Sequence, residues 1–334
     1  MEPLALAASP APPAETRPGP SLWIKRDDRG AAPYGGNKPR KLEWLLADAL
    51  RQGASRVLTA GGIGSNHALA TALYGAEHGL EVHLLLFPQP VTEHVRMSLR
   101  LYAHLGAVMH LGGGLSGLAE RMAELSATLP SCYPIPMGGS THLGCLGFVD
   151  AAFELADQVR GGLLPCPSRI FVAGGTCGTL AGLLVGTKLA GLRSRVTGVR
   201  VVDRSVGNAA VVLELAEGAL RTLRDLEPAA VPRVSLDEDD FELLDSYYGD
   251  GYGSPTVEGE RALRLLEDRA GIELESTYTA KTLAAVLDAC ERTPPDETIL
   301  FWNTFAGPVL AGLVIGAGEE SVPAEFRKFL TARG

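Results

Sequence analysis

Hydrophobic runs alternate with amphipathic segments along most of the chain. Apolar runs that predict buried strands lie at residues 56–60, 82–87, 108–111, 169–173, 196–202 and 299–302. Apolar positions with helical spacing lie at residues 39–51, 66–78, 92–105 and 180–192. Apolar strands that alternate with helices are typical of parallel sheets covered on both faces. The pattern therefore predicts an α/β fold with a parallel sheet that carries helices on both faces.

An uncharged stretch at residues 298–318 is long enough to cross a bilayer. Asn303, Pro308 and several glycines interrupt it. These interruptions favour a buried strand at residues 298–302 and a helix at residues 308–315 over a membrane span.

Composition narrows the class of protein. The chain has 334 residues, with 30 Lys and Arg against 39 Asp and Glu. Its length favours two domains. A net charge of −9 argues against a nucleic-acid partner and against anionic membrane surfaces. The five cysteines show no C-x-x-C spacing, which favours reduced thiols in the cytoplasm. Residues 1–20, rich in Ala and Pro, lack the features of a secretory signal and are expected to form a flexible arm.

The first candidate for chemistry is the turn Gly35-Gly36-Asn37-Lys38-Pro39. Proline suits the first position of a helix, which places Lys38 at the N-cap. The positive end of the helix dipole there disfavours a protonated amine, and an amine of lowered pKa suits Schiff-base chemistry. Taken alone, the local sequence fits a solvated surface lysine better.

Two further glycine turns each join a predicted strand to a predicted helix. Residues 61–67, Gly-Gly-Ile-Gly-Ser-Asn-His, could bind an anion at a helix N-terminus, although the spacing is not that of a dinucleotide site. Residues 174–179, Gly-Gly-Thr-Cys-Gly-Thr, offer a nest of N–H donors for a phosphate without the ending of a nucleotide P-loop. Within the second turn, Cys177 is interpreted as a packing residue and not a nucleophile, since no basic neighbour is evident.

Two tyrosines in predicted loops, Tyr252 and Tyr278, could act as acid/base groups, although packing roles are the commoner interpretation. The seven histidines show no metal-binding spacing, so we expect no catalytic metal. A G-x-S-x-G elbow of a serine hydrolase is also absent from the sequence.

Together these segments resemble the family of 1-aminocyclopropane-1-carboxylate (ACC) deaminases and D-cysteine desulfhydrases, which are pyridoxal-phosphate (PLP) enzymes of the tryptophan-synthase-β-like fold, fold type II. The matching motifs are Lys25-Arg26-Asp27-Asp28, Tyr34-Gly35-Gly36-Asn37-Lys38, Ser65-Asn66-His67, Gly138-Gly139-Ser140, the loop at residues 174–179, and Tyr278-Thr279 with Lys281. The resemblance covers residues 22–312 and implies an α/β fold with two open, twisted, parallel-type sheets flanked by helices. It overturns the surface interpretation of Lys38.

The resemblance implies a role for each matching residue. Lys38 would form a Schiff base with PLP, Asn66 would bond the ring hydroxyl, and Thr279 would meet the pyridine nitrogen. The phosphate would lie on Gly174, Gly175, Thr176, Cys177, Gly178 and Thr179, with help from Lys41. Ser65, Asn66 and His67 would hold the carboxylate of a small amino-acid substrate, which Tyr252, Tyr278, Thr304 and Phe305 would face. Lys38, Ser65, Tyr252 and Tyr278 are the expected catalytic residues.

Two hydroxyl residues bear on the reaction. In the family, deaminases look to carry Glu at the position of Thr279 and Leu at that of Thr304, whereas desulfhydrases carry hydroxyl residues at both. The resemblance therefore implies a carbon–sulfur lyase that eliminates a β-substituent and yields pyruvate and ammonia, with sulfide from D-cysteine. ACC deamination, elimination from cysteate or serine, a non-catalytic PLP-binding protein and a generic dinucleotide-binding protein are the alternatives.

The substrate end departs from the family pattern. Gly64 stands where Gln is frequent, Ala68 and Leu69 where Arg is common, and Asn303-Thr304-Phe305-Ala306 where His-Thr-Gly-Gly is usual. These changes leave the substrate and its enantiomer open. We further expect a large domain of residues 1–51 and 152–334, an inserted small domain of residues 52–151, and, from the resemblance, a homodimer.

Overall fold

The protein is described here by a computed structural model that covers residues 1–4, 19–306 and 318–331. Two compact units divide the chain. The large unit contains Met1–Asn37 and Cys145–Gly307, and the small unit contains Lys38–Gly144 with the described residues from 318 onwards. Each unit has its own sheet of mostly parallel strands, as the resemblance implies.

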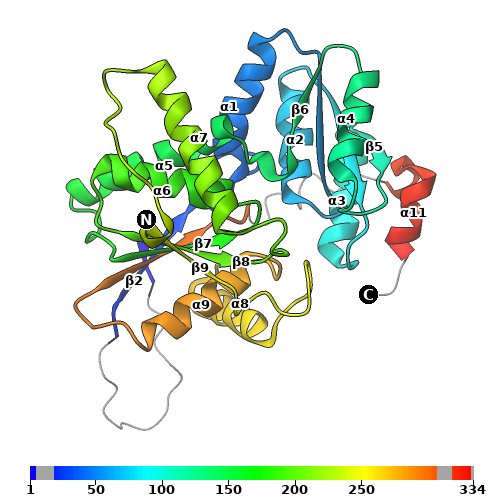
Figure 1. Cartoon of the computed structure of the whole chain (residues 1–334). Helices are drawn as coiled ribbons and strands as arrows, with labels where there is room; N and C mark the ends of the chain where they lie inside the picture. The colour runs from blue at the N-terminus through cyan, green and yellow to red at the C-terminus, as the bar shows by residue number, and fades with distance from the viewer. Residues whose placement is uncertain (5–18, 307–317, 332–334) are drawn as a thin grey trace. The chain divides into compact units, whose positions relative to one another are not determined.

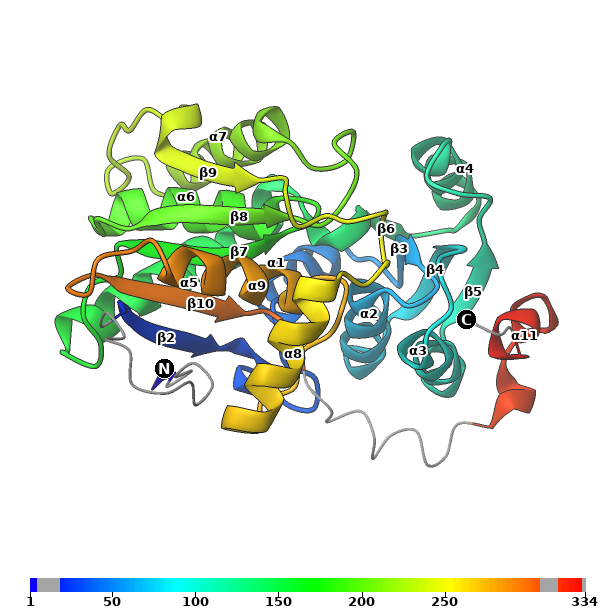
Figure 2. The ribbon, with the colours of Figure 1, turned by 90° about the horizontal axis from the view of Figure 1, so that it is seen from below.

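The sheet of the large unit has six strands within the described ranges. In chain order they are β1 (Glu2–Pro3), β2 (Ser21–Arg26), β7 (Arg169–Gly174), β8 (Arg195–Arg200), β9 (Phe241–Leu244) and β10 (Thr298–Asn303). Their order across the sheet is β1-β2-β10-β7-β8-β9, and every pair is parallel except β1 with β2. Figure 2 shows β2, β10, β7, β8 and β9 side by side.

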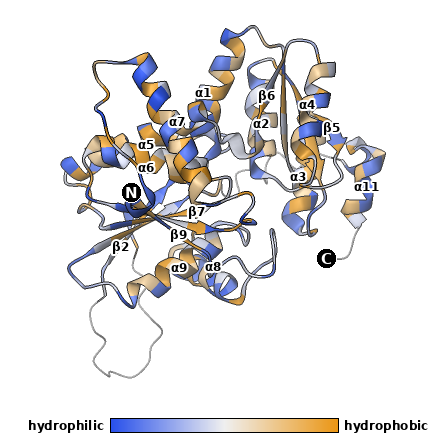
Figure 3. Ribbon diagram, in the orientation of Figure 1, coloured by the Kyte–Doolittle hydropathy of each residue, from blue (hydrophilic) through white to orange (hydrophobic). Residues whose placement is uncertain are grey.

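Helices cover both faces of this sheet. On one face lie α5 (His142–Arg160), α6 (Gly178–Ala190) and α7 (Ala209–Leu226), and on the other lie α8 (Val257–Ala270) and α9 (Thr279–Cys290) (Figure 1). The core towards α8 and α9 contains Phe171, Phe301 and Leu283. In Figure 3, α7 and α8 alternate between hydrophilic and hydrophobic colours, as expected for helices with one solvated face.

A close approach between α5 and α6 depends on a glycine. A Cβ atom at Gly182 would lie 2.4 Å from the carbonyl oxygen of Cys145 and 2.6 Å from Cβ of Phe148. A side chain at residue 182 would therefore force the two helices apart.

The small unit has a four-stranded parallel sheet in the order β5-β4-β3-β6, again among the described residues. Its strands are β3 (Arg56–Gly62), β4 (Glu81–Phe87), β5 (Val108–Leu111) and β6 (Cys132–Ile135). Its helices are α1 (Lys38–Arg51), α2 (Asn66–Glu77), α3 (Glu93–His104), α4 (Leu118–Thr128) and α11 (Ala324–Thr331). The two faces of β3 alternate, because Val57 lies towards Gly75 of α2 while Leu58 packs with Leu118 of α4.

The predicted α/β class is confirmed, and the predicted strands and helices are present with ends that differ by one or two residues. The apolar pattern did not predict β1, β2, β6 or β9. Strand β2 contains Lys25, which breaks the pattern; Lys25 is nevertheless buried, where its ammonium pairs with Glu154 and lies over the ring of Trp302. Strand β6 contains Pro134. The helix expected at residues 308–315 lies outside the described residues.

The compact units divide the chain at other residues than the expected 51/52 and 151/152. Helix α1 groups with the small unit because it packs on α2 and on the short helix η2 (Met137–Gly139). At the N-terminus, where a flexible arm is expected, Glu2 and Pro3 pair with Ile24 and Trp23 of β2; residues 5–18 lie outside the described residues. Across the described ranges, every helix is too short or too polar to cross a membrane.

Candidate active site

The loop between β7 and α6 contains a left-handed residue at the N-terminus of the helix. Cys177 is the N-cap of α6 and adopts a left-handed conformation with φ 63°. For a residue with a side chain this conformation costs about 1–2 kcal/mol, so the surrounding structure must enforce it. Successive N–H groups that turn through such a conformation at a helix N-terminus converge on an anion. The buried thiol of Cys177 lies 3.5 Å from the carbonyl oxygen of Gly175, which agrees with its interpretation as a packing residue.

Asn37 is anchored on two segments that the sequence separates widely. Its side-chain amide donates to the hydroxyl of Thr179, at 3.1 Å, and its backbone N–H donates to the carbonyl of Thr304, at 3.1 Å. Lys38, the first residue of α1, follows it directly in the chain. The backbone that leads into Lys38 is therefore fixed by the last residue of the glycine loop and by the end of β10.

Gly36 makes this anchoring possible. Its φ is +80°, and a Cβ atom there would lie 2.6 Å from the carbonyl oxygen of Thr304. Only glycine combines that conformation with that approach. The glycine that the sequence places two residues before Lys38 is thus required by the backbone.

The two predicted tyrosines lie together. Tyr252 stands in the turn before α8 and Tyr278 is the N-cap of α9. Their hydroxyl oxygens are 2.7 Å apart, and their rings meet edge to face at 6.2 Å. Desolvation by burial raises the pKa of Tyr252, so its hydroxyl stays protonated at neutral pH.

The tyrosine pair also lies beside the glycine loop. A Cβ atom added at Gly175 would be 3.4 Å from Cε1 of Tyr278. Within the large unit, the structure therefore brings together three of the predicted features, the loop at residues 174–179 and both tyrosines.

Thr279, the first residue of α9, is 1% exposed. Its hydroxyl accepts a hydrogen bond from the N–H of Glu275 at 3.1 Å and lies 3.2 Å from that residue's carboxylate oxygen Oε1. The same carboxylate accepts from the N–H groups of Thr277, Tyr278 and Thr279, each at 2.8 Å. Glu275 thus caps α9 and holds the Thr279 side chain.

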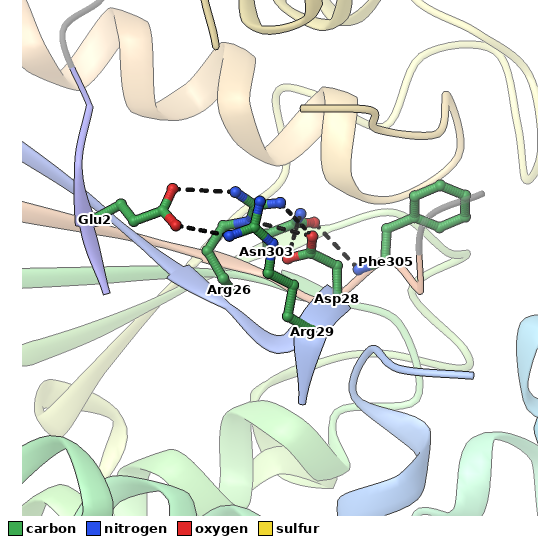
Figure 4. A network of polar contacts seen from close by, with 6 residues as sticks. All are labelled: Glu2, Arg26, Asp28, Arg29, Asn303 and Phe305. Atoms are coloured by element: carbon green, nitrogen blue, oxygen red, sulfur yellow. Dashed lines mark hydrogen bonds and ion pairs between the residues drawn. The ribbon is translucent and has the colours of Figure 1, made fainter. Parts of the chain in front are cut away.

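A polar network supports the segment that contains Thr304 and Phe305 (Figure 4). The amide of Asn303 donates to Asp28 at 3.3 Å, and its oxygen accepts from the N–H of Phe305 at 3.2 Å. Arg26 binds Asp28 at 2.6 Å, and both Arg26 and Arg29 bind Glu2. The ring of Phe305 points away from this network in Figure 4. The backbone of Phe305 is therefore held by Asn303.

In the small unit, Ser65 caps α2. Its hydroxyl accepts from the N–H of Ala68 at 3.2 Å, and its carbonyl accepts from the hydroxyl of Tyr102 at 2.9 Å. Asn66 is the first residue of α2 and is half-buried. Ala68 and Leu69, at the positions where Arg is common in the family, are fully buried.

His67 is 2% exposed, and within the described part of the chain neither of its ring nitrogens has a hydrogen-bond partner. Burial lowers its pKa well below 6.5, with further lowering by the charges of Lys38 and Lys41, so the ring is neutral. Lys41 is also buried, and its ammonium donates to Gly138 O at 3.2 Å and to the hydroxyl of Ser140 at 3.1 Å. A buried neutral imidazole of this kind can hydrogen-bond a ligand without adding a charge.

Gln89 lies over the turn that precedes Ser65. Its side-chain oxygen accepts from the N–H of Gly64 at 3.2 Å. A Cβ atom at Gly62 would be 2.0 Å from that same oxygen. The glycines at residues 62 and 64 thus leave room for an amide that comes from another segment.

The supporting residues Asn37, Gln89, Glu275 and Asn303 are not among those for which the sequence predicts a role in the site. Asn37 lies within the motif Tyr34-Gly35-Gly36-Asn37-Lys38, and Glu275 lies four residues before the start of α9, so the sequence indicates that both are near the site. Nothing in the sequence around Gln89 indicates such a role. Among the described residues, His, Cys, Asp and Glu side chains nowhere gather in groups of three that could hold a metal ion.

Comparisons with known proteins agree on one family. The chain matches the family described as "Pyridoxal-phosphate dependent enzyme" over residues 6–304. It is 36% identical over 303 residues to a D-cysteine desulfhydrase of Klebsiella pneumoniae (strain 342), and 34% identical over 307 residues to one of Serratia proteamaculans (strain 568). In both cases 87% of this chain and 88% of the relative are covered.

A solved structure agrees with these relatives. A crystal structure of an "ACC deaminase homologue" superposes with a TM-score of 0.73 and 30% identity, over 90% of this chain and 89% of that one. The fold and the cofactor class implied by the sequence motifs are therefore confirmed, and the chain belongs to the pyridoxal-phosphate dependent enzyme family.

Proposed function

We propose that this protein is a PLP-dependent lyase of the D-cysteine desulfhydrase type, which eliminates the β-substituent of a small amino acid. The observation that carries the proposal is the double anchoring of Asn37, on Thr179 and on Thr304. It ties the backbone before Lys38 to a glycine loop suited to phosphate. The identity to the Klebsiella pneumoniae desulfhydrase, 36% over 87% of this chain, supports the reaction type.

The side chains fit PLP. The left-handed turn at Cys177 suits a phosphate, and glycine at residue 175 leaves the backbone open beside Tyr278. An amine at Lys38 suits covalent attachment of an aldehyde. The unpartnered ring nitrogens of buried His67 call for a polar ligand. In this proposal the loop at residues 174–179 and Lys41 hold the phosphate, Asn66 binds the ring hydroxyl and Thr279 lies at the ring nitrogen.

PLP, when bound, supplies an electron sink for the α-carbon of an attached amino acid. The chain's own groups do the rest. Ser65, Asn66 and His67 bind the substrate carboxylate, and the uncharged His67 does so through a hydrogen bond. The amine of Lys38 takes the α-proton. Tyr252, which burial keeps protonated at neutral pH, is hydrogen-bonded to Tyr278, and this pair can direct one proton towards the departing group.

Overall, D-cysteine and water give pyruvate, ammonia and hydrogen sulfide. ACC deamination is the second candidate, and the 30% identity to the solved ACC deaminase homologue favours it. The hydroxyl residues Thr279 and Thr304 support β-elimination instead, because the resemblance associates this pair with desulfhydrases. Phe305 and Gly64 leave other β-substituted amino acids as candidate substrates.

The test is a substrate panel with purified, PLP-loaded protein. It contains D- and L-cysteine, D- and L-serine, cysteate, larger β-substituted amino acids and ACC, with pyruvate, 2-oxobutanoate and sulfide as the measured products. We expect pyruvate from a β-substituted amino acid, with sulfide from D-cysteine. Release of 2-oxobutanoate from ACC alone would favour the second candidate, and no product from any member would contradict both. The homodimer implied by the family is also a proposal, for which light scattering gives the mass in solution.

A further inference from the structure

Glu275 occupies the N-terminus of α9. Its carboxylate accepts three backbone N–H bonds of 2.8 Å, from Thr277, Tyr278 and Thr279. A helix N-terminus with its N–H groups satisfied in this way has little capacity left for the anion of a ligand. At this end, α9 can therefore contact a ligand through side chains and not through backbone N–H groups. Thr279 is the first residue of α9 that could do so.

Among the described residues, the hydrogen bonds of the Thr279 hydroxyl all involve Glu275. The hydroxyl oxygen accepts from the Glu275 N–H at 3.1 Å. Its proton can go to the carboxylate oxygen Oε1, at 3.2 Å, or to the carbonyl oxygen of the same residue, at 3.4 Å. A hydroxyl has one proton and two lone pairs. The proton and one lone pair of the hydroxyl are used in hydrogen bonds with Glu275. Towards a ligand, the Thr279 hydroxyl can therefore act only as a hydrogen-bond acceptor.

We propose that Glu275 is a positioning residue that makes Thr279 a polarised acceptor for the cofactor's ring nitrogen and so favours the protonated ring. This inference rests on the proposed function, which assigns Thr279 to that nitrogen. A hydrogen bond to the charged form of a group, and an opposite charge nearby, both favour that form. The Glu275 carboxylate thus acts on the ring nitrogen indirectly, through the neutral hydroxyl of Thr279. A neutral threonine without such a carboxylate beside it would favour the protonated ring less.

The charge of Glu275 reaches neighbouring groups as well. It contributes to the raised pKa of Tyr252, after the larger effect of burial, and it opposes the lowering of the Lys281 pKa that burial causes. These two effects are secondary to the hydrogen bonds. They agree with a carboxylate whose field extends through this part of the large unit.

The experiment uses holoenzyme loaded with PLP that carries nitrogen-15 in the ring, and follows the nitrogen chemical shift as a function of pH. Glu275→Gln removes the charge and keeps one oxygen, which can still accept from the N–H groups of Tyr278 and Thr279 but not from that of Thr277. We expect it to lower the ring-nitrogen pKa by about one unit or more. The matched control is Glu273→Gln, an exposed position two residues away, which should leave the titration unchanged.

Thr279→Val is a second variant that leaves the cap of α9 in place and removes the hydroxyl. It should also lower the ring-nitrogen pKa. A Glu275→Gln titration identical to that of wild type overturns the inference, and so does an unchanged titration in Thr279→Val. If wild-type protein does not bind PLP at all, the proposed function is wrong. That result is distinct from an unchanged titration in a PLP-loaded variant, which contradicts only the role of Glu275.

Discussion

The hydroxyl oxygen of Tyr252 lies 2.7 Å from that of Tyr278, although 26 positions separate them in the sequence. Burial keeps Tyr252 protonated, so the pair can donate a proton to the departing group, and solvent then returns a proton to the pair. We expect Tyr252→Phe and Tyr278→Phe each to lower kcat by about 10²–10⁴-fold, the usual contribution of a positioned acid or base. Steady-state kinetics on the substrate identified by the panel measures this.

Tyr247→Phe is the control for both variants. The Tyr247 hydroxyl donates to Asp288 at 2.7 Å, and burial raises its pKa to about 12, so it too is a desolvated, bonded tyrosine. Its variant should keep kcat. If all three variants lose activity equally, the effect is one of packing, and the acid/base role of the pair is wrong.

His67 predicts an acid-sensitive stability. Its pKa in the folded state is lowered below 6.5 by burial, so the unfolded chain binds the proton more readily. Stability is therefore intact above pH 6.5 and falls as the pH drops below it, by at most about 1.4 kcal/mol per pH unit from this group. His67→Gln should flatten the fall in the free energy of unfolding, measured by urea denaturation between pH 7.5 and 5.5.

His78→Gln is the matched control, because His78 is exposed at the end of α2. It should leave the slope of wild type unchanged. Parallel stability curves for wild type and His67→Gln would show that His67 does not resist protonation in the folded protein.

Gly182 predicts a purely structural effect. A Cβ atom would overlap the Cys145 carbonyl and Phe148, so Gly182→Ala should lower the free energy of unfolding by about 1–3 kcal/mol. Gly113→Ala, at an exposed position where a Cβ atom meets nothing within 4 Å, should change stability little. Equal stabilities of the two variants, measured by urea denaturation, would mean that α5 and α6 adapt without cost.

Phe305 predicts a change in substrate preference. Its backbone is held by Asn303 whatever its side chain, so Phe305→Gly should open space without releasing the segment. We expect the ratio of kcat/KM for a bulky over a small β-substituent to rise by about tenfold, as for other changes of pocket volume. Phe305→Leu, which retains most of the bulk, should stay near wild type. A ratio that does not move in Phe305→Gly would place the ring away from the substrate.

The sequence predicts the parts of the fold and site that depend on local pattern. Apolar strands alternating with helices predict the α/β class, and glycine turns before helices predict the loops around Lys38 and Thr179. Contacts between distant segments are not predictable in this way. Asn303 and Asp28 are 275 positions apart, and their hydrogen bond follows only from the pairing of β10 with β2.

Glu275 shows a second limit. An acidic residue shortly before a helix fits an ordinary cap, and only the geometry shows that its carboxylate also contacts the Thr279 hydroxyl. Strand β2 shows a third limit of prediction from sequence. The burial of Lys25 depends on Glu154 and Trp302, and neither residue is near Lys25 in the sequence.

The central claim is that Lys38 carries the cofactor. Borohydride reduction of the PLP-loaded protein, followed by peptide mass spectrometry, tests it most directly. We predict a pyridoxyl group on the peptide that contains Lys38, its loss in Lys38→Ala, and its retention in Lys188→Ala, where a surface lysine paired with Asp240 is removed. A pyridoxyl group on another lysine, or none on wild-type protein, would contradict the account.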